Sequence, residues 1–160
     1  MTRIALRPYS VRQSELLAQQ GLHPVLARLM AARGLADPRE LSTALDALIA
    51  PAALTQVDRA ALFLADAIDA GQRMVIVADY DCDGATACAV GVRGLRAYGA
   101  DVHYLVPDRV TLGYGLTPAM VEIAARLEPE VLITVDNGIA SVDGIAAARA
   151  HGMATVITDH

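Results

Sequence analysis

The chain has 160 residues, of which 54% are hydrophobic and 4% aromatic, and its formal net charge at pH 7 is -5. This apolar content excludes an intrinsically disordered chain, and no apolar run reaches the roughly 18 residues that a membrane-spanning helix needs. Every cation is an arginine, and the overall balance is acidic, whereas nucleic-acid-binding domains are normally basic. The charge is uneven: residues 1–73 carry eight arginines against seven acids, and residues 74–160 carry five arginines against eleven acids.

The first residues of the chain lack the apolar segment of a signal peptide. The two cysteines, Cys82 and Cys88, form no C-x-x-C pattern and no disulfide framework. We therefore expect a soluble, cytoplasmic protein with reduced thiols and no membrane association.

The first part of the chain, residues 1–73, is predicted to be helical. Apolar residues recur there with the period of a helix, between proline and glycine residues that favour helix starts and stops. Helices are predicted over residues 24–34, 37–50 and 57–70. The second of these begins with Asp37-Pro38-Arg39-Glu40, which is typical of a capping box.

Strands and helices alternate after residue 73. Strands are predicted over residues 74–78, a short β-branched segment, and over residues 102–106, 131–135 and 154–158. Helices are predicted over residues 85–98, 118–127 and 141–151. Such alternation is typical of an α/β fold with a parallel sheet flanked by helices. We expect two domains, a small helical N-terminal segment over residues 1–73 and an α/β catalytic domain over residues 74–160.

Acidic residues follow three of the four predicted strands. The polar residues at these strand ends are Asp79, Asp81, Asp83, Asp136, Asn137, Asp159 and His160. Ligands of open α/β sheets bind at the carboxyl ends of the strands, and carboxylates crowded there repel one another unless cations neutralise them. Oxygen ligands with one imidazole suit Mg²⁺ or Mn²⁺. Two such ions about 3.5–4 Å apart catalyse phosphoryl transfer.

Two other interpretations of these aspartates exist. The run from Asp79 to Gly84 also matches the start of an EF-hand calcium loop, but that loop needs a glutamate at its twelfth position, where this chain has Val90. Aspartate is also common in turns and helix caps. A purely structural role therefore remains open, above all for Asp159.

A long loop over residues 107–117 follows the second predicted strand. It contains Arg109, and it places Tyr114 between Gly113 and Gly115. An arginine there can pair with a phosphate, and a tyrosine can stack on a base or use its hydroxyl group. The alternative is an ordinary glycine-rich connection with a solvated arginine.

Four ordered motifs resemble those of the DHH phosphoesterase superfamily, and within it the RecJ exonucleases most closely. They are VADYDCDGAT at residues 77–86, the loop at 107–118 that ends in GYGLTP, LITVDNGI at 132–139 and TDH at 158–160. The resemblance covers essentially the whole chain, because RecJ proteins also carry a helical segment before the first motif. It implies 5′–3′ hydrolysis of single-stranded DNA with Mn²⁺ or Mg²⁺, in DNA repair and recombination.

The resemblance also implies roles for individual residues. The implied metal ligands are Asp79, Asp81, Asp83, Asp136 and His160; the implied catalytic residues are Asp81, Asp83, Asp136 and Asp159; the implied DNA contacts are Arg109, Gly113, Tyr114, Gly115 and Asn137. Asp81 would bind one cation, Asp83 the other, and Asp136 would bridge both. Asp159 would orient His160.

The sequence departs from the family pattern in three places. Cys82 stands where alanine is common, and Asp108 stands where asparagine is common, which adds a negative charge beside Arg109. The superfamily is named for Asp-His-His, and this chain ends after the first histidine. It also lacks the later aspartate of the metal site and the C-terminal domain. The resemblance thus implies an N-terminal piece of a longer protein, and we expect little or no nuclease activity from these 160 residues alone.

Two alternative functions stay open. One is another DHH phosphodiesterase, acting on short oligonucleotides or cyclic dinucleotides; the helical N-terminal segment and the GYGLTP loop speak against it. The other is a non-catalytic, nucleic-acid-binding member of the family. The intact Asp81, Asp83 and Asp136 speak against that one.

Overall fold

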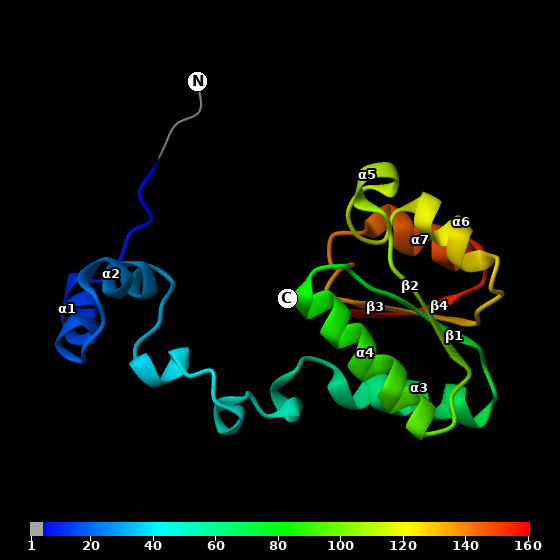
Figure 1. Cartoon of the computed structure of the whole chain (residues 1–160), viewed down its shortest axis with the longest axis horizontal. Coiled ribbons are helices and arrows are strands. Elements are labelled where there is room, and N and C mark those ends of the chain that lie inside the picture. Colours follow the sequence, from blue (N-terminus) through cyan, green and yellow to red (C-terminus); the bar gives the residue numbers. More distant parts are fainter. Residues whose placement is uncertain (1–4) are drawn as a thin grey trace. The chain divides into compact units, whose positions relative to one another are not determined.

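A computed structural model describes residues 5–160 (Figure 1). The chain forms two compact units, one that ends at Leu54 and one that extends from Thr55 to His160. The elements of the first unit are α1 (Val11–Gln19), α2 (Pro24–Ala32) and the 3₁₀ turns η1 (Pro38–Leu41), η2 (Leu45–Ala47) and η3 (Pro51–Ala53). Helices α1 and α2 pack through a small core of Leu17, Ala27 and Ala31. Helix α2 confirms the helix predicted over residues 24–34, whereas α1 was not predicted.

The α-helix predicted over residues 37–50 is wrong. The capping box of Asp37 and Glu40 is present, but it begins only the short 3₁₀ turn η1. The apolar side chains that suggested a helical face are exposed, with Leu45 at 85% and Ile49 at 83%. Helical periodicity stabilises a helix in water mainly when the apolar face is packed against a partner, and this face is not.

The second unit holds the sheet. Its elements are α3 (Val57–Asp69), β1 (Met74–Val77), α4 (Cys82–Ala97), β2 (Val102–Leu105), α5 (Arg109–Leu112), α6 (Pro118–Ala125), β3 (Val131–Val135), α7 (Val142–Ala150) and β4 (Ala154–Thr158). The strands are all parallel, in the order β2-β1-β3-β4. This arrangement confirms the predicted α/β fold class. The short helix α5 lies inside the segment that was predicted to be a loop.

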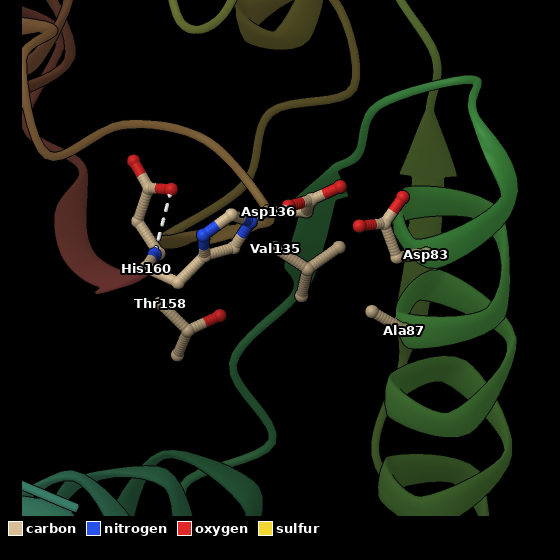
Figure 2. A pocket seen from close by; sticks show the side chains of 7 residues that line it. Asp83, Ala87, Val135, Asp136, Thr158 and His160 are labelled. Atoms are coloured by element: carbon tan, nitrogen blue, oxygen red, sulfur yellow. Dashed lines mark hydrogen bonds and ion pairs between the residues drawn. The ribbon is translucent and has the colours of Figure 1, made fainter. Parts of the chain in front are cut away.

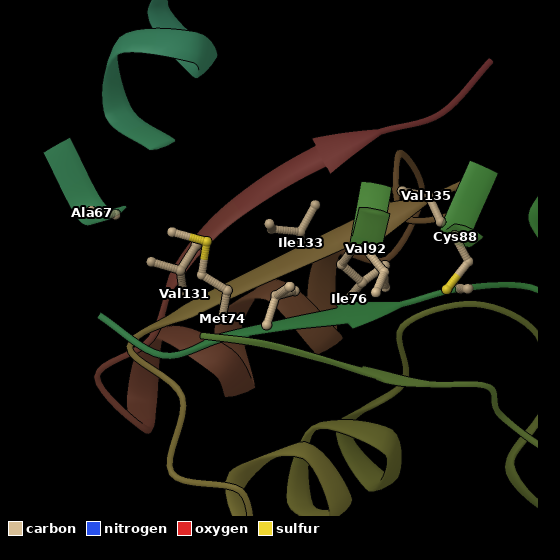
Figure 3. Packing of buried hydrophobic residues seen from close by; sticks show 10 residues of the cluster. Ala67, Met74, Ile76, Cys88, Val92, Val131, Ile133 and Val135 are labelled. Atoms are coloured by element: carbon tan, nitrogen blue, oxygen red, sulfur yellow. The ribbon is translucent and has the colours of Figure 1, made fainter. Parts of the chain in front are cut away.

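Helices cover both faces of the sheet (Figure 1). On one face, Met74 and Ile76 of β1 and Ile133 of β3 pack against Cys88 and Val92 of α4, as Figure 3 shows. The alternate strand residues point to the other face, where they pack under α6 and α7; they include Val75, Val77 and Leu132. Strands buried on both faces are continuously apolar, which is why these segments are recognisable in the sequence.

Helix α3 belongs to the same core as the sheet. Ala67 is buried in it, and Phe63 and Leu64 pack against it. The predicted boundary at residue 73 therefore lies inside the second unit, between α3 and β1, and as a domain boundary it stays a prediction. Within residues 5–160, no single helix is long and apolar enough to cross a membrane; the segments 45–53 and 57–69 reach that length and composition only when taken together.

Candidate metal centre

The carboxyl ends of β1, β3 and β4 place their acidic residues at one edge of the sheet. Asp79 follows β1, Asp136 follows β3 directly, and His160 follows β4. Asp81 is the N-cap of α4, and Asp83 lies in the first turn of that helix. A parallel sheet therefore brings together five residues that are up to 81 positions apart in the chain.

Two groups of ligand atoms are formed there. The atoms of Asp83, Asp136 and His160 lie within 4.8 Å of one another, and so do those of Asp79, Asp81 and Asp136. Asp136 belongs to both groups. A carboxylate shared between two neighbouring sites is suited to holding a pair of divalent cations. The donors are carboxylate oxygens and one imidazole nitrogen, which fit Mn²⁺ or Mg²⁺.

Asp136 lies at the middle of this centre in an unusual backbone conformation. Its φ is +63°, a left-handed value that aspartate tolerates better than most residues, and its N–H donates to the carbonyl oxygen of Thr158 at 3.0 Å. Burial raises the pKa of the Asp136 carboxyl, and so do the charges of Asp83 and Asp81. The Nε2 atom of His160 lies 3.1 Å from Oδ1 of Asp136. The centre thus concentrates negative charge that a cation would relieve.

The N-terminus of α4 lies tightly against the end of β1. Partial burial favours a higher pKa for Asp81, but the N–H of Gly84 and the side chains of Asp83 and Arg109 outweigh it, so this pKa lies below its usual value. A Cβ at Gly84 would stand 2.7 Å from Cβ of Asp79 and 2.8 Å from its carbonyl oxygen. Only glycine permits this close approach of helix and strand end.

Arg109 points into the centre. Its Nε donates to Oδ1 of Asp79 at 2.9 Å, and its Nη2 donates both to Oδ2 of Asp79 and, at 3.1 Å, to Oδ2 of Asp81. The guanidinium carbon lies 4.4 Å from the ring centre of Tyr80 and 4.9 Å from that of Tyr114. The predicted DNA contact of Arg109 stays a prediction. Tyr80 was missed in the sequence, although an aromatic residue between two candidate ligands was a visible signal.

The glycine-rich loop lies beside Asp136. Gly113 and Gly115 have φ values of +79° and +75°, which favour glycine. The hydroxyl group of Tyr114 donates to the carbonyl oxygen of Asp136 at 3.1 Å, while 60% of the residue remains exposed. The carboxylate of Asp108 accepts from the N–H of Val110 at 2.9 Å and so caps α5. DNA contacts of this loop stay predictions.

Asn137 is buried and is 1% exposed. Its side-chain nitrogen donates to the carbonyl oxygens of Val77 at 3.1 Å and Val135 at 2.9 Å. The amide therefore joins the carboxyl ends of β1 and β3. The predicted contact of Asn137 with DNA stays a prediction. Burial of its side chain between the two strand ends disfavours such a contact.

Asp159 belongs to neither group of ligand atoms. Its Oδ2 accepts from the N–H of Ile139 at 2.8 Å, and its Oδ1 accepts from the N–H of His160 at 2.9 Å. Asp159 thus holds the loop after β3 against the end of β4 and positions the backbone of His160. A direct part in catalysis stays a prediction.

A pocket of about 250 Å³ opens between the first turns of α4 and the carboxyl ends of β3 and β4. It is lined by Asp83, Ala87, Val135, Asp136, Thr158, Asp159 and His160. In Figure 2, Asp83 of α4 and His160 lie on opposite sides of this pocket with Asp136 between them. The pocket thus gives a small ligand access to one of the two groups of ligand atoms.

Comparison with known proteins finds RecJ exonucleases among the relatives of this chain. The chain is 41% identical over 140 residues to the single-stranded-DNA-specific exonuclease RecJ of Salmonella typhimurium, covering 87% of this chain and 24% of that protein. It is 40% identical over 161 residues to the RecJ of Dickeya dadantii, covering 100% of this chain and 27% of that protein. The chain therefore spans about a quarter of the length of these relatives.

Solved structures give the same result. An exonuclease RecJ bound to manganese matches with a TM-score of 0.65 at 35% identity, covering 71% of this chain and 29% of that one. RecJ of Thermus thermophilus in complex with Mn²⁺ matches with a TM-score of 0.60 at 29% identity, covering 97% of this chain and 22% of that one. Residues 73–160 match the sequence model of the DHH family, N-terminal domain. The chain belongs to the DHH family.

Proposed function

We propose that this chain carries the two-cation centre of a single-stranded-DNA-specific 5′–3′ exonuclease of RecJ type, which hydrolyses phosphodiester bonds in DNA repair and recombination. The observation that carries the proposal is the sharing of Asp136 between two groups of cation ligands. The named activity of the relatives and the manganese in the matching structures support it.

The residues of the centre divide the work of hydrolysis. One cation would be held by Asp79, Asp81 and Asp136, and the other by Asp83, Asp136 and His160. Divalent cations placed there activate a water molecule and neutralise charge on the phosphate and the leaving oxygen. Asp159 positions His160 because its carboxylate accepts from the N–H of His160.

The substrate side of the centre is formed by the loop after β2. Tyr114 is 60% exposed beside Asp136, so its ring is available to stack on a base of single-stranded DNA. Gly113 and Gly115 allow the backbone of this loop to turn tightly around it. The hydrogen bond between Tyr114 and Asp136 supports an aromatic surface next to the cations that would bind the phosphate.

We place this activity in the cytoplasm, in line with the two free cysteines.

The first test is a calorimetric titration of the EDTA-treated chain with Mn²⁺. Since Asp136 serves both groups, Asp136→Asn should abolish or strongly weaken both binding events. Asp143→Asn removes an acid from the first turn of α7, outside both groups, and should leave them unchanged. If the parent chain binds no Mn²⁺, or if Asp136→Asn binds it as the parent does, the proposed centre is wrong.

The second test concerns the substrate class. Fluorescence anisotropy with Mn²⁺ present compares a 5′-phosphorylated single-stranded oligonucleotide, the matched duplex and a dinucleotide. Stronger binding of the single strand supports the RecJ-type activity. Equal or stronger binding of the dinucleotide would instead favour a phosphodiesterase acting on short oligonucleotides.

A further inference from the structure

We propose that Arg109 is a built-in counter-cation of the Asp79–Asp81 side of the centre, and that a divalent cation has to displace it in order to bind there. The inference rests on the cation-binding function proposed above. It adds a competition between a side chain of the protein and the cation for the same two carboxylates.

The first argument is the burial of Asp79. Its side chain is only 4% exposed, and an ionised carboxylate out of contact with water is costly unless a cation compensates it. Both of its oxygens accept from Arg109, and Oδ1 also accepts from the N–H of Tyr80 at 2.7 Å. Arg109 thus supplies the positive charge that compensates the buried carboxylate of Asp79 in the folded state.

The second argument is that the guanidinium of Arg109 and a divalent cation need the same place. A single nitrogen, Nη2 of Arg109, donates to both Asp79 and Asp81. The same two carboxylates, together with Asp136, form one of the two groups of cation ligands. A divalent cation of this class binds oxygen at about 2.0–2.1 Å, which leaves no room for a nitrogen between the two carboxylates. Binding therefore breaks at least one of the bonds of Nη2.

The third argument is that Arg109 has another contact available. Its guanidinium lies over the rings of Tyr80 and Tyr114, which attract a cation through their π faces. Arg109 stands at the start of α5, a helix of four residues that precedes Gly113 in the loop between β2 and α6. The side chain can leave the carboxylates and keep its aromatic contacts without a movement of the sheet.

The two groups of ligands should consequently bind cations unequally. Among the ion pairs of residues 5–160, Arg109 joins Asp79 and Asp81, whereas Asp136 pairs with His160. The group of Asp83, Asp136 and His160 is free of this competitor. We expect the cation held by that group to bind more tightly than the cation that displaces Arg109.

The test is a Mn²⁺ titration of the EDTA-treated chain and three variants. Arg109→Gln removes the competitor, Arg109→Lys keeps the charge without the fork of donors, and Arg149→Gln removes a positive charge from the last turn of α7 as a matched control. Calorimetry measures the affinities, and thermal melting in EDTA measures the stability of the cation-free form. Because the chain has no tryptophan, its fluorescence is that of its five tyrosines, which include Tyr80 and Tyr114.

Competition predicts opposite changes in the two measurements for Arg109→Gln. One of the two Mn²⁺ affinities should rise about tenfold, as the loss of charge-assisted hydrogen bonds implies, while the melting temperature in EDTA falls. Arg109→Lys should lie between the parent and Arg109→Gln, and Arg149→Gln should match the parent. Addition of Mn²⁺ should change tyrosine fluorescence in the parent more than in Arg109→Gln.

Unchanged or weaker Mn²⁺ binding by Arg109→Gln would overturn the inference, since Arg109 would then support the cation rather than compete with it. That outcome leaves the proposed function intact. Absence of Mn²⁺ binding in the parent and in every variant would overturn both. If Arg109→Gln does not fold in EDTA, Arg109→Lys replaces it in the test. Tighter Mn²⁺ binding than in the parent then supports the inference, and unchanged or weaker binding overturns it.

Discussion

The side-chain nitrogen of Asn137 lies 3.1 Å from the carbonyl oxygen of Val77. This bond joins the carboxyl ends of two neighbouring strands, β3 and β1. Asp136 precedes Asn137, and Asp79 follows Val77 by two residues. The separation of these two candidate ligands therefore depends on a buried amide that belongs to neither group of ligand atoms.

Asn137→Ala should destabilise the chain in the absence of DNA and of divalent cations. The variant leaves the carbonyl oxygens of Val77 and Val135 without this donor, which costs about 1–3 kcal/mol for buried polar groups. Urea denaturation in EDTA measures the loss. A variant as stable as the parent that binds single-stranded DNA less well would instead identify Asn137 as a contact of the substrate.

Gly84→Ala should disrupt the centre. The added Cβ would meet the backbone of Asp79 at 2.8 Å, so the N-terminus of α4 has to move away from β1, at a cost of about 1–3 kcal/mol. Thermal melting should show this loss, and calorimetry should show weaker Mn²⁺ binding.

Gly94→Ala is the matched control for this substitution. It lies in the same helix, and its Cβ would have no neighbour within 4 Å. Alanine in a helix interior is favoured over glycine by about 0.5–1 kcal/mol, so this variant should be as stable as the parent or more stable. Equal behaviour of the two variants would contradict the close approach of helix and strand.

Asp136→Asn should change how stability depends on pH in the cation-free chain. The raised pKa of Asp136 means that the folded state binds this proton more tightly than the unfolded state does. The parent therefore loses stability as the pH rises from the usual pKa of an aspartate through the raised value. Asp136→Asn lacks this loss, and asparagine tolerates the left-handed φ of this position.

Chemical denaturation in EDTA measures the free energy of unfolding at pH values from about 3.5 to about 7.5, in steps of about one pH unit, and so shows whether stability rises or falls with pH. The stability of Asp136→Asn relative to the parent should grow through this window and then level off. With Mn²⁺ the order should reverse, because only the parent gains stability from the bound cation. A parent chain that gains stability over Asp136→Asn as the pH rises in EDTA would contradict the direction of the pKa shift.

Tyr114→Leu should weaken the binding of single-stranded DNA. Loss of a stacking ring costs about 1–3 kcal/mol per base, whereas Tyr114→Phe keeps the ring and loses only the hydrogen bond to Asp136. Fluorescence anisotropy should rank the affinities as parent, Phe variant and Leu variant. Tyr98→Leu, at the exposed C-cap of α4, should bind as the parent does.

Three of the four strands, β1, β3 and β4, were predictable from the sequence because each is a short segment with a high share of β-branched residues. Strand β2 has the sequence VHYL, with a single β-branched residue, and was predictable from its place in the strand–helix alternation. Caps and apolar periods also mark helices that pack on the strands: the side chain of Thr117, which precedes Pro118 in the sequence, caps α6. The same reasoning failed over residues 37–50, where a helical pattern has exposed apolar side chains instead of a packed face. It also missed α1.

The sequence by itself determined the α/β fold and the set of acidic residues that follow its strands, because both depend on neighbouring residues and on the rule that parallel strands end at one edge. Only the tertiary structure decided which side chains face one another across that edge. The pairing of Arg109 with Asp79 joins residues 30 positions apart, and the amide of Asn137 reaches a strand 60 positions away. Such contacts arise from the close approach of elements distant in the chain, which no local pattern encodes.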